Sequence, residues 1–412
     1  MRSRPFIALY IAVFVATMGI SMVSPLLPVY AQELGASEVW LGLTFSAFAI
    51  PQAIFGPFAG RLSDRFGRKP FIIAGLGIYI IAALGYLTAQ SFIQVIAFRV
   101  FSGFGTSLIF SVARAYVGDM TPKGHEGRWL GVFATADIVG FGTGPLLAGI
   151  LRQAVGFHSV FIAMAALLTA SAFILIIWLP RHSPLEVRQR SGEVQRPGKI
   201  TFHQALSDRL VLAVTAHQGL LSLALGASFS FLALRLEDDL LVNPVLIGLA
   251  FATQDITGGC AQPLFGRLAD RFSRRLLVAV GLGLNGSLLA LVGFAPSYWL
   301  VIFLLFSMGA ASALSAVAAA ALQVVAGRRV GMGTVLGLGS AANGAGVVVG
   351  SVVGGLLVQQ FNISAAFVLG GALMTAGVPI FLGLTRGIAT REAATSVPQP
   401  VELLAGGVAG GE

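Results

Sequence analysis

Residues 60–69 read Gly-Arg-Leu-Ser-Asp-Arg-Phe-Gly-Arg-Lys and join two long apolar segments. Residues 266–275 read Gly-Arg-Leu-Ala-Asp-Arg-Phe-Ser-Arg-Arg, which is the same pattern 206 residues further along the chain. A second set repeats with the same offset and comprises Gly131, Gly140, Gly144 and Gly149 in one segment and Gly337, Gly346, Gly350 and Gly355 in the other. Because chance similarity would not give one offset twice, we infer two halves related by duplication.

The composition indicates a chain embedded in a membrane. Apolar residues make up 56% and charged residues 10% of the 412 residues, whereas about 25% are charged in an average soluble protein. The mean hydropathy is +0.87. A soluble domain cannot hide that much apolar surface, because its exposed shell needs charge. These values exclude a soluble enzyme, a fibrous protein and a disordered chain.

Apolar runs of about 20 residues, the length that a spanning helix needs, occur twelve times. They are residues 6–31, 40–60, 70–89, 92–116, 129–151, 157–179, 210–234, 245–266, 276–295, 298–325, 332–358 and 363–385. The first run follows Arg2 and Arg4 like a signal peptide, but it is too long, and Pro25 and Pro28 stand where a cleavage site would need small residues. We interpret it as a retained span.

The basic residues predict the orientation in the membrane. If the N-terminus is cytoplasmic, 22 of the 26 Lys and Arg residues fall in cytoplasmic segments, as the positive-inside rule requires. Of the others, Arg114 ends span 4 on the inside, Arg99 lies within the membrane, and Arg152 and Arg235 fall outside. The net charge of +9 therefore needs no nucleic-acid partner. The acidic run 237–239 at the outer mouth is expected to be a solvated loop, with attraction of cations as the alternative.

The predicted fold is all-α, with twelve transmembrane helices in two pseudo-symmetric six-helix bundles. We expect the N-terminal bundle over residues 1–185, a cytoplasmic linker over 186–208, the C-terminal bundle over 209–388 and a disordered cytoplasmic tail over 389–412. Halves of this kind pack around an axis along the membrane normal, with the substrate site between them near the midplane.

Several motifs resemble those of the major facilitator superfamily, and the resemblance covers nearly the whole chain. Residues 60–69 match the family's loop between spans 2 and 3, and Arg99 with Gly103 and Gly105 resembles an element of its span 4. Span 5 is similar to the antiporter signature, with Ala148 in place of one glycine. The proline pair of span 1 is also similar to twelve-span drug:proton antiporters, so the resemblance implies a proton-coupled exporter.

The resemblance also implies a conformational latch on the cytoplasmic face. Asp64, Arg114 and Asp119 resemble the family's charge relay there. A carboxylate at this place can pair with Arg or accept from a neighbouring helix start, and such a contact holds only while the halves are close on that side. The alternative is plain topology signalling by basic residues. The remaining candidates for the latch are Arg65, Arg68 and Asp270.

The small residues of span 5 predict a close helix contact. Gly140 and Gly144 share one face, which allows tight packing in lipid, and Pro145 removes one helical hydrogen bond and permits a bend. We expect Gly131, Gly140, Gly144, Pro145 and Gly149 to form a contact across the two halves, with an interface inside one half as the alternative.

Arg99, Asp137 and Asp255 each lie about nine residues into a predicted span, near the bilayer middle. Each costs on the order of 3 kcal/mol there, so they should face partners or water. A carboxyl group that moves between water and a low-dielectric site changes its affinity for protons. We therefore assign proton coupling to Asp137 and Asp255, with Arg99 as a partner that tunes an acid. The alternative for Asp137 is a structural hydrogen bond or an ion pair with Arg99, and the alternative for Arg99 is a substrate anchor. For Asp255 the alternative is a contact with cationic substrate or a structural role.

A group of polar and aromatic residues is a candidate lining for a cavity between the halves. It comprises Gln52, Phe104, Phe141, His217, Gln218, Phe251 and Asn343. Asn343 is the uncharged counterpart of Asp137 at the offset of 206. A lone embedded His is more often a packing residue than a proton carrier, and most Phe side chains of a membrane protein face lipid or core.

No motif points to ATP, a cofactor or a metal, and the single cysteine, Cys260, excludes an internal disulfide. The driving force must be an ion gradient or the gradient of the substrate. We expect no enzyme but a monomeric proton-coupled antiporter of the cell membrane, of the multidrug efflux type, that exports small amphipathic compounds by alternating access. The alternative is a transporter of one metabolite, such as a sugar, siderophore or lipid, in either direction. A transport-dead scaffold or sensor would have no need for embedded charges.

Overall fold

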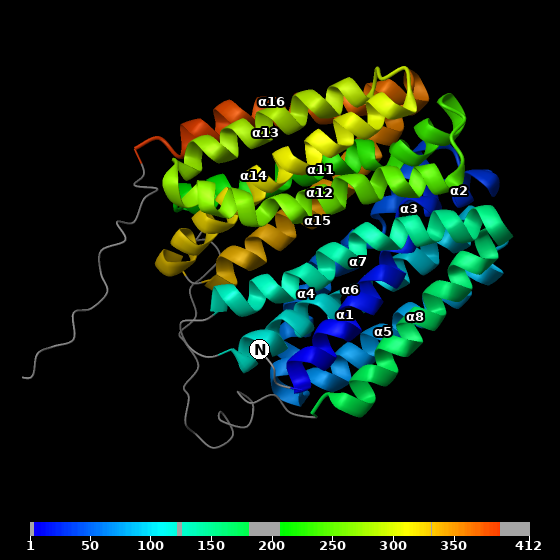
Figure 1. Cartoon of the computed structure of the whole chain (residues 1–412), viewed down its shortest axis with the longest axis horizontal. Helices are drawn as coiled ribbons and strands as arrows, with labels where there is room; N and C mark the ends of the chain where they lie inside the picture. The colour runs from blue at the N-terminus through cyan, green and yellow to red at the C-terminus, as the bar shows by residue number, and fades with distance from the viewer. Residues whose placement is uncertain (1–3, 122–125, 181–206, 331, 388–412) are drawn as a thin grey trace, which may run out of the picture.

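The computed structural model describes residues 4–121, 126–180, 207–330 and 332–387, and these residues are almost entirely helical. The N-terminal half contains α1 (Arg4–Val23), α2 (Leu26–Glu33), α3 (Glu38–Ser46), α4 (Ala49–Phe66), α5 (Arg68–Thr88), α6 (Phe92–Met120), α7 (Glu126–Val155) and α8 (Phe157–Trp178). The C-terminal half contains α11 (Arg209–Leu234), the π-helical turn η1 (Arg235–Asp239), α12 (Pro244–Arg271), α13 (Arg274–Val292), α14 (Tyr298–Val330), α15 (Met332–Gln360) and α16 (Ile363–Leu384) (Figure 1).

These helices follow the order of the twelve predicted spans, because α1–α2, α3–α4 and α11–η1 each make one span. Within the described part of the chain, eleven spans are long and apolar enough to cross a membrane. The remaining long helix, α12, is less apolar because it carries Gln254, Asp255 and Gln262. The expected all-α fold of two six-helix bundles is confirmed.

One proline and one glycine explain two of the breaks between helices. Pro25 interrupts the first span between α1 and α2, because its ring removes a backbone donor and clashes with the preceding turn. Gly67, between α4 and α5, has φ of 100°, a conformation that side chains other than glycine rarely adopt. Its counterpart Ser273 has φ of −64°, so the two related loops turn differently.

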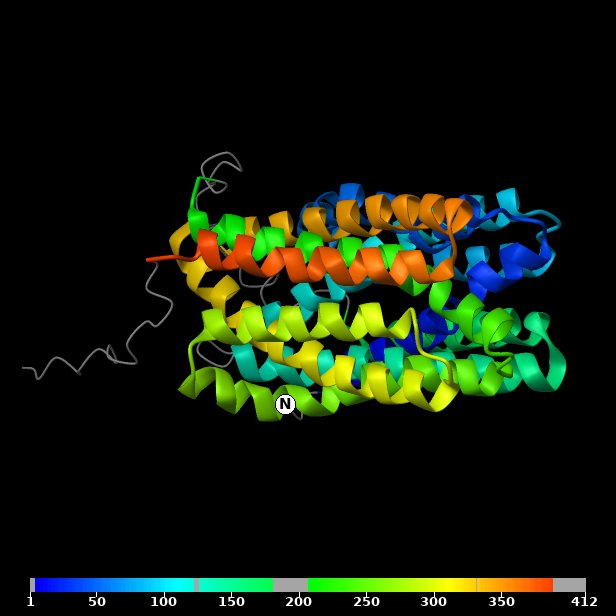
Figure 2. The ribbon, with the colours of Figure 1, turned by 90° about the horizontal axis from the view of Figure 1, so that it is seen from above.

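The two bundles lie side by side, with their helices running along one common direction (Figures 1 and 2). We name the two ends by their charge. Lys69 and Arg275 begin helices at the basic end, and they donate to carbonyl oxygens that end α8 and α16, namely Ile176 and Leu382. The acidic end, opposite, carries Glu33 and residues 237–239.

Helix contacts in one half recur in the other at an offset of 206 residues. A Cβ atom at Gly42 would overlap the carbonyl oxygen of Ser351, and one at Gly248 would overlap that of Pro145. Within the halves, Gly75 lies against Gly105 as Gly281 lies against Ala311. The same pairing holds for Gly103 on Phe48 and Gly309 on Gln254. The duplication inferred from the motifs therefore extends to the backbone contacts.

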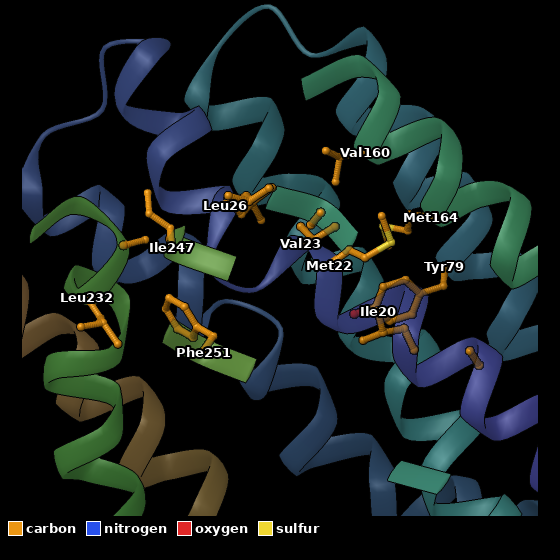
Figure 3. Close-up of a cluster of buried hydrophobic side chains, with 14 of the residues drawn as sticks. Ile20, Met22, Val23, Leu26, Tyr79, Val160, Met164, Leu232, Ile247 and Phe251 are labelled. Carbon is orange, nitrogen blue, oxygen red and sulfur yellow. The ribbon is translucent and has the colours of Figure 1, made fainter. Parts of the chain in front are cut away.

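The buried apolar side chains form two clusters. One contains the core of the N-terminal half and the acidic-end part of the C-terminal half. The other contains only C-terminal residues near the basic end, among them Leu210, Leu322 and Phe381. Among the described residues, the halves thus share a continuous core only toward the acidic end. Figure 3 draws this shared region, from Val160, Met164, Met22, Val23 and Leu26 of one half to Leu232, Ile247 and Phe251 of the other.

The contacts between halves also reach the middle of the helices. Ile138 of α7 would meet a Cβ at Gly259 of α12, and Ala53 of α4 would meet one at Gly344 of α15.

The predicted linker (186–208) and tail (389–412) fall almost wholly on residues 181–206 and 388–412, outside the described ranges. The domain boundaries therefore stay predictions.

Candidate functional site

Asp137 is the centre of a polar cluster between three helices of the N-terminal half. Thr17 on α1 donates its hydroxyl to Asp137 Oδ1 at 3.3 Å. Arg114 on α6 pairs with Oδ2 at 3.3 Å through Nη2. The side chain of Asp137 is 11% exposed and that of Arg114 is 65% exposed. A buried carboxylate is thus held by a cation that the surrounding protein leaves largely exposed.

The alternative that Asp137 pairs with Arg99 is wrong. Arg99 lies seven residues after Phe92, the start of α6 at the acidic end. Asp137 lies eleven residues after Glu126, the start of α7 at the basic end. The 15 residues between Arg99 and Arg114 correspond to about 22 Å along α6. Since α6 and α7 enter from opposite ends, only Arg114 reaches the depth of Asp137.

Arg99 is buried without a carboxylate among the described residues. Its guanidinium carbon lies 4.5 Å from the ring centre of Phe48, which is a cation–π contact. Nε and Nη1 have no hydrogen-bond partner in the described part of the chain. No described acid therefore lies beside Arg99 to fit its expected role as a partner that tunes an acid.

Asp255 on α12 differs from Asp137 because no described residue pairs with its carboxylate. It is half-buried and lies one helical turn beyond Phe251, whose ring packs at 4.9 Å on Phe229. Phe229 in turn lies 6.4 Å from Phe45 of the other half. Asp255 thus has a carboxylate without a partner in the described part of the chain, one helical turn from an aromatic cluster that joins the halves.

The two acids lie on neighbouring helices, since α7 packs along α12. Ile138 meets Gly259 and Pro145 meets Gly248, so the helices run antiparallel with Asp255 about one turn from the level of Asp137. The carboxylates do not form a pair. Asp137 turns toward α1 and α6, whereas α7 presents Ile138 and Gly142 to α12.

The matching place in the C-terminal half is polar but neutral. Asn343 on α15 donates through Nδ2 to the hydroxyl of Ser222 on α11 at 2.6 Å. The residue that matches Arg114 at the offset of 206 is Ala320. The acid and its cation therefore occur in only one half.

The glycines of α7 divide between two helix faces. A Cβ at Gly140 would overlap Thr17, and one at Gly144 would overlap Ser21, both on α1 of the same half. The expected contact across the halves is wrong for these two, because their face of α7 turns toward α1. Gly149 lies instead against Pro244, and Pro145 against Gly248, both of α12. Gly131 has no atom within 4 Å of its Cβ position.

Among the latch candidates, Arg68 and Asp119 form an ion pair inside the N-terminal half. Arg68 Nε lies 3.0 Å from Asp119 Oδ2, and both side chains are buried. Arg114, which we grouped with the latch, lies beside Asp137 instead. The side chains of Asp64, Arg65 and Asp270 lie outside the described residues. A latch between the halves stays a prediction.

The other cavity candidates lie in several places. His217 is buried, with Nε2 at 3.3 Å from the hydroxyl of Ser315 on α14, which is the packing role that we gave as its alternative. Phe251 is buried as well. Phe104 packs on Phe55 at 4.7 Å, and Phe141 stacks on Phe110 at 6.5 Å. Gln52 and Gln218 are half-buried.

An ionic cluster that was not predicted from the sequence lies between the halves at the acidic end. Arg152 at the end of α7 forms two hydrogen bonds with Glu237 in η1, at 2.6 and 2.7 Å. Arg235 pairs with Asp239 at 3.3 Å. The expected loop at 237–239 is therefore wrong, because these residues belong to a π-helical turn and Glu237 is paired, whereas Asp238 and Asp239 are exposed as expected. A signal was present, because Arg152 and Arg235 are the two basic residues that the predicted topology leaves outside.

No three described His, Cys, Asp or Glu side chains gather in a way that could hold a metal ion.

The Major Facilitator Superfamily profile matches residues 9–234 and 218–405. The chain is similar to the multidrug resistance protein MdtG of Enterobacter lignolyticus, with 28% identity over 408 residues, which covers 95% of this chain and 94% of that protein.

It is also similar to the quinolone resistance protein NorA of Staphylococcus aureus, with 27% identity over 390 residues, 92% of this chain and 96% of that protein. An uncharacterized MFS-type transporter of Methanocaldococcus jannaschii is 24% identical over 364 residues, 86% of this chain and 92% of that protein. Among solved structures, the human organic anion transporter MFSD10 is similar in fold, with a TM-score of 0.67, 19% identity and coverage of 92% of this chain and 99% of that chain.

Proposed function

The chain belongs to the major facilitator superfamily, and we propose that it is a proton-coupled antiporter that exports small amphipathic compounds by alternating access. It is a transporter rather than an enzyme, and its substrate is a small molecule that crosses the bilayer between the two halves. The basic end faces the cytoplasm in this proposal, with both termini on that side in the cell membrane. The transporter acts as a monomer.

The observation that carries the coupling is the ion pair between buried Asp137 and exposed Arg114. A carboxylate that has one cationic partner can exchange it for a proton, because either one neutralises its charge. Proton binding to Asp137 would release Arg114, and proton loss would restore the pair. The two states differ in the contact between α6 and α7, so the proton can bias the conformation of the N-terminal half.

Export of amphipathic compounds is supported by the names of the relatives, a multidrug resistance protein and a quinolone resistance protein. Asp255 supports a preference for cations, because its carboxylate has no described partner and lies one helical turn from Phe251, which packs on Phe229. An organic cation would find charge compensation at the carboxylate and an aromatic surface at the half-buried Phe229, since Phe251 itself is buried. Neutral substrates would use the aromatic groups alone.

The test is transport in liposomes under an imposed pH gradient, with fluorescent organic cations and neutral drugs as substrates. We expect uphill export by the wild-type protein that stops when an ionophore removes the gradient. Proton release from detergent-purified protein on adding the same compounds is the second measurement. Transport of one sugar, siderophore or lipid, with no response to drugs, would replace the proposal with the transporter of one metabolite.

A further inference from the structure

We propose that Arg152, Glu237 and Glu33 form an ionic gate at the acidic end, in which Arg152 exchanges partners between the two halves during transport. Arg152 ends α7 and Glu33 ends α2, both in the N-terminal half, while Glu237 lies in η1 of the C-terminal half. This inference rests on the proposed alternating access. It adds a residue set that neither coupling nor substrate binding uses.

The geometry of Arg152 favours a strong contact with Glu237. The guanidinium binds both carboxylate oxygens, at 2.6 and 2.7 Å, which is the strong planar arrangement of an Arg–carboxylate pair. The Arg152 side chain is 9% exposed, so salt screens the pair weakly. The ring of Phe157 lies 4.4 Å from its guanidinium carbon and limits its rotamers. The arginine is therefore held ready for the carboxylate.

The π-helical turn explains why Glu237 reaches across. An α-helix that widens into one π turn changes the direction of the side chains that follow. η1 covers Arg235–Asp239, and Arg235 anchors it to its own half through Ser364 and the carbonyl oxygen of Ala295. Asp238 accepts from Gln32 of the other half at 3.1 Å. The turn thus presents two acidic side chains to the N-terminal half.

Glu33 gives Arg152 a second partner that stays when the halves part. Its Oε1 lies 3.6 Å from Arg152 Nη2, and its side chain is 55% exposed. Separation of the halves at this end removes Glu237 from Arg152 but leaves Glu33 in the same half. A replacement partner lowers the cost of leaving a partly buried guanidinium unpaired. Glu237 therefore stabilises the closed end, and Glu33 stabilises the open end.

The experiment measures the distance between the halves at this end. Spin labels are placed on Val155→Cys of α7 and Leu241→Cys beside η1, two exposed positions in different halves. The background is Cys260→Ser, which removes the single native cysteine. Pulsed electron–electron spin resonance in nanodiscs, without substrate or gradient, then reports the closed and open populations.

We expect Glu237→Gln to raise the ratio of open to closed by about tenfold, and Glu33→Gln to lower it. The pair of changes Arg152→Glu and Glu237→Arg should restore the closed population that each single change removes. Asp239→Asn is the matched control, because its partner Arg235 lies in its own half, and it should leave the distances unchanged.

Equal distances in the wild type and in Glu237→Gln, with only a lower melting temperature, would mean a structural staple and overturn the gate. A shift of Glu33→Gln in the same direction as Glu237→Gln would overturn the exchange of partners. The measurement needs no drug and no proton gradient. If the distances respond as expected and liposomes show no proton-driven export, the gate stands and the proposed coupling fails.

Discussion

Asp137 and Asn343 occupy matching positions in the two halves, 206 residues apart, and have opposite surroundings. Asp137 is held by Thr17 and the cation Arg114, whereas Asn343 donates to Ser222 in a neutral pair. The small residues on the same helices keep their partners, since Gly144 meets α1 as Gly350 meets α11. The duplicated backbone thus retains its packing, while the titratable group is confined to one half.

The largest effect is expected for Asp137→Asn, which gives the N-terminal half the same amide as Asn343 at the matching position of the C-terminal half. We expect uphill export to fall to the level of empty liposomes, because the group that exchanges a proton for Arg114 is gone. Binding of ligand and downhill exchange should remain, since an amide fits the same volume. The measurement is export driven by a pH gradient, beside equilibrium binding to the same protein.

The reciprocal change sharpens the comparison. Asn343→Asp added to Asp137→Asn moves the acid to the C-terminal half, where Ala320 replaces the cation. We expect no recovery of uphill export. Recovery would mean that the acid alone suffices and that Arg114 is dispensable. Full proton-driven export by Asp137→Asn and Asp255→Asn combined would exclude both carboxylates as the coupling site.

The next effect concerns Asp255, whose matching residue in the first half is Ala49. We expect Asp255→Asn to weaken the binding of organic cations by about 10- to 100-fold, the range for a contact with a charged group. The affinity for neutral substrates should stay nearly unchanged. Binding titrations with a matched cationic and neutral pair check this. An equal loss for both would assign Asp255 to coupling or folding.

A smaller effect tests the shared packing. Gly144→Ala places a Cβ against Ser21 and Met18, and Gly350→Ala places one against Leu223 and Ala227. Each should destabilise the protein by about 1–3 kcal/mol, the usual cost of overpacking. Gly131→Ala, whose Cβ position is open, is the control. Thermal unfolding in detergent is the measurement, and unequal losses at 144 and 350 would contradict equivalent packing.

The smallest effect concerns the matching cations at the basic end. Lys69 donates to the carbonyl oxygens of Ile176 and Leu179 at 2.7 and 2.6 Å, as Arg275 does to Leu382. Lys69→Met and Arg275→Met should each cost about 0.3–1 kcal/mol, the value of a cation at a helix C-terminus. Hydrogen exchange should rise only in the last turns of α8 and α16. Loss of transport at constant stability would give Lys69 a further role.

The fold could be predicted because both of its signals are local in the sequence. Apolar runs mark helices, and the glycines at positions such as 140 and 346 repeat with a fixed offset. The partners of Asp137 could not be predicted, because they depend on helix length and rotation. The predicted span 4 ends at residue 116, whereas α6 continues to Met120. Arg114 therefore lies inside a helix and not at its end.

The ionic cluster at the acidic end was missed for a related reason. Hydropathy places residues 237–239 after a span, but it carries no information on which side chain of another segment meets them. Arg152 is 85 residues from Glu237 in sequence, and only the packing of α7 against α12 brings them together. Opposite charges left on the outer side were a sign that pairs exist, though not of which pairs.

In the proposed transport cycle, the contacts Ile138–Gly259 and Ala53–Gly344 in the middle of the helices would form the pivot between the two halves. Arg152 lies 14 residues after Ile138 on α7, a distance of about 21 Å along the helix. A relative tilt of the halves by about 15° around this pivot, the size seen for subunit rotations, moves Arg152 by about 5 Å. That displacement exceeds the reach of the Arg152–Glu237 hydrogen bonds, so a modest rock of the whole bundle separates this pair without bending any helix.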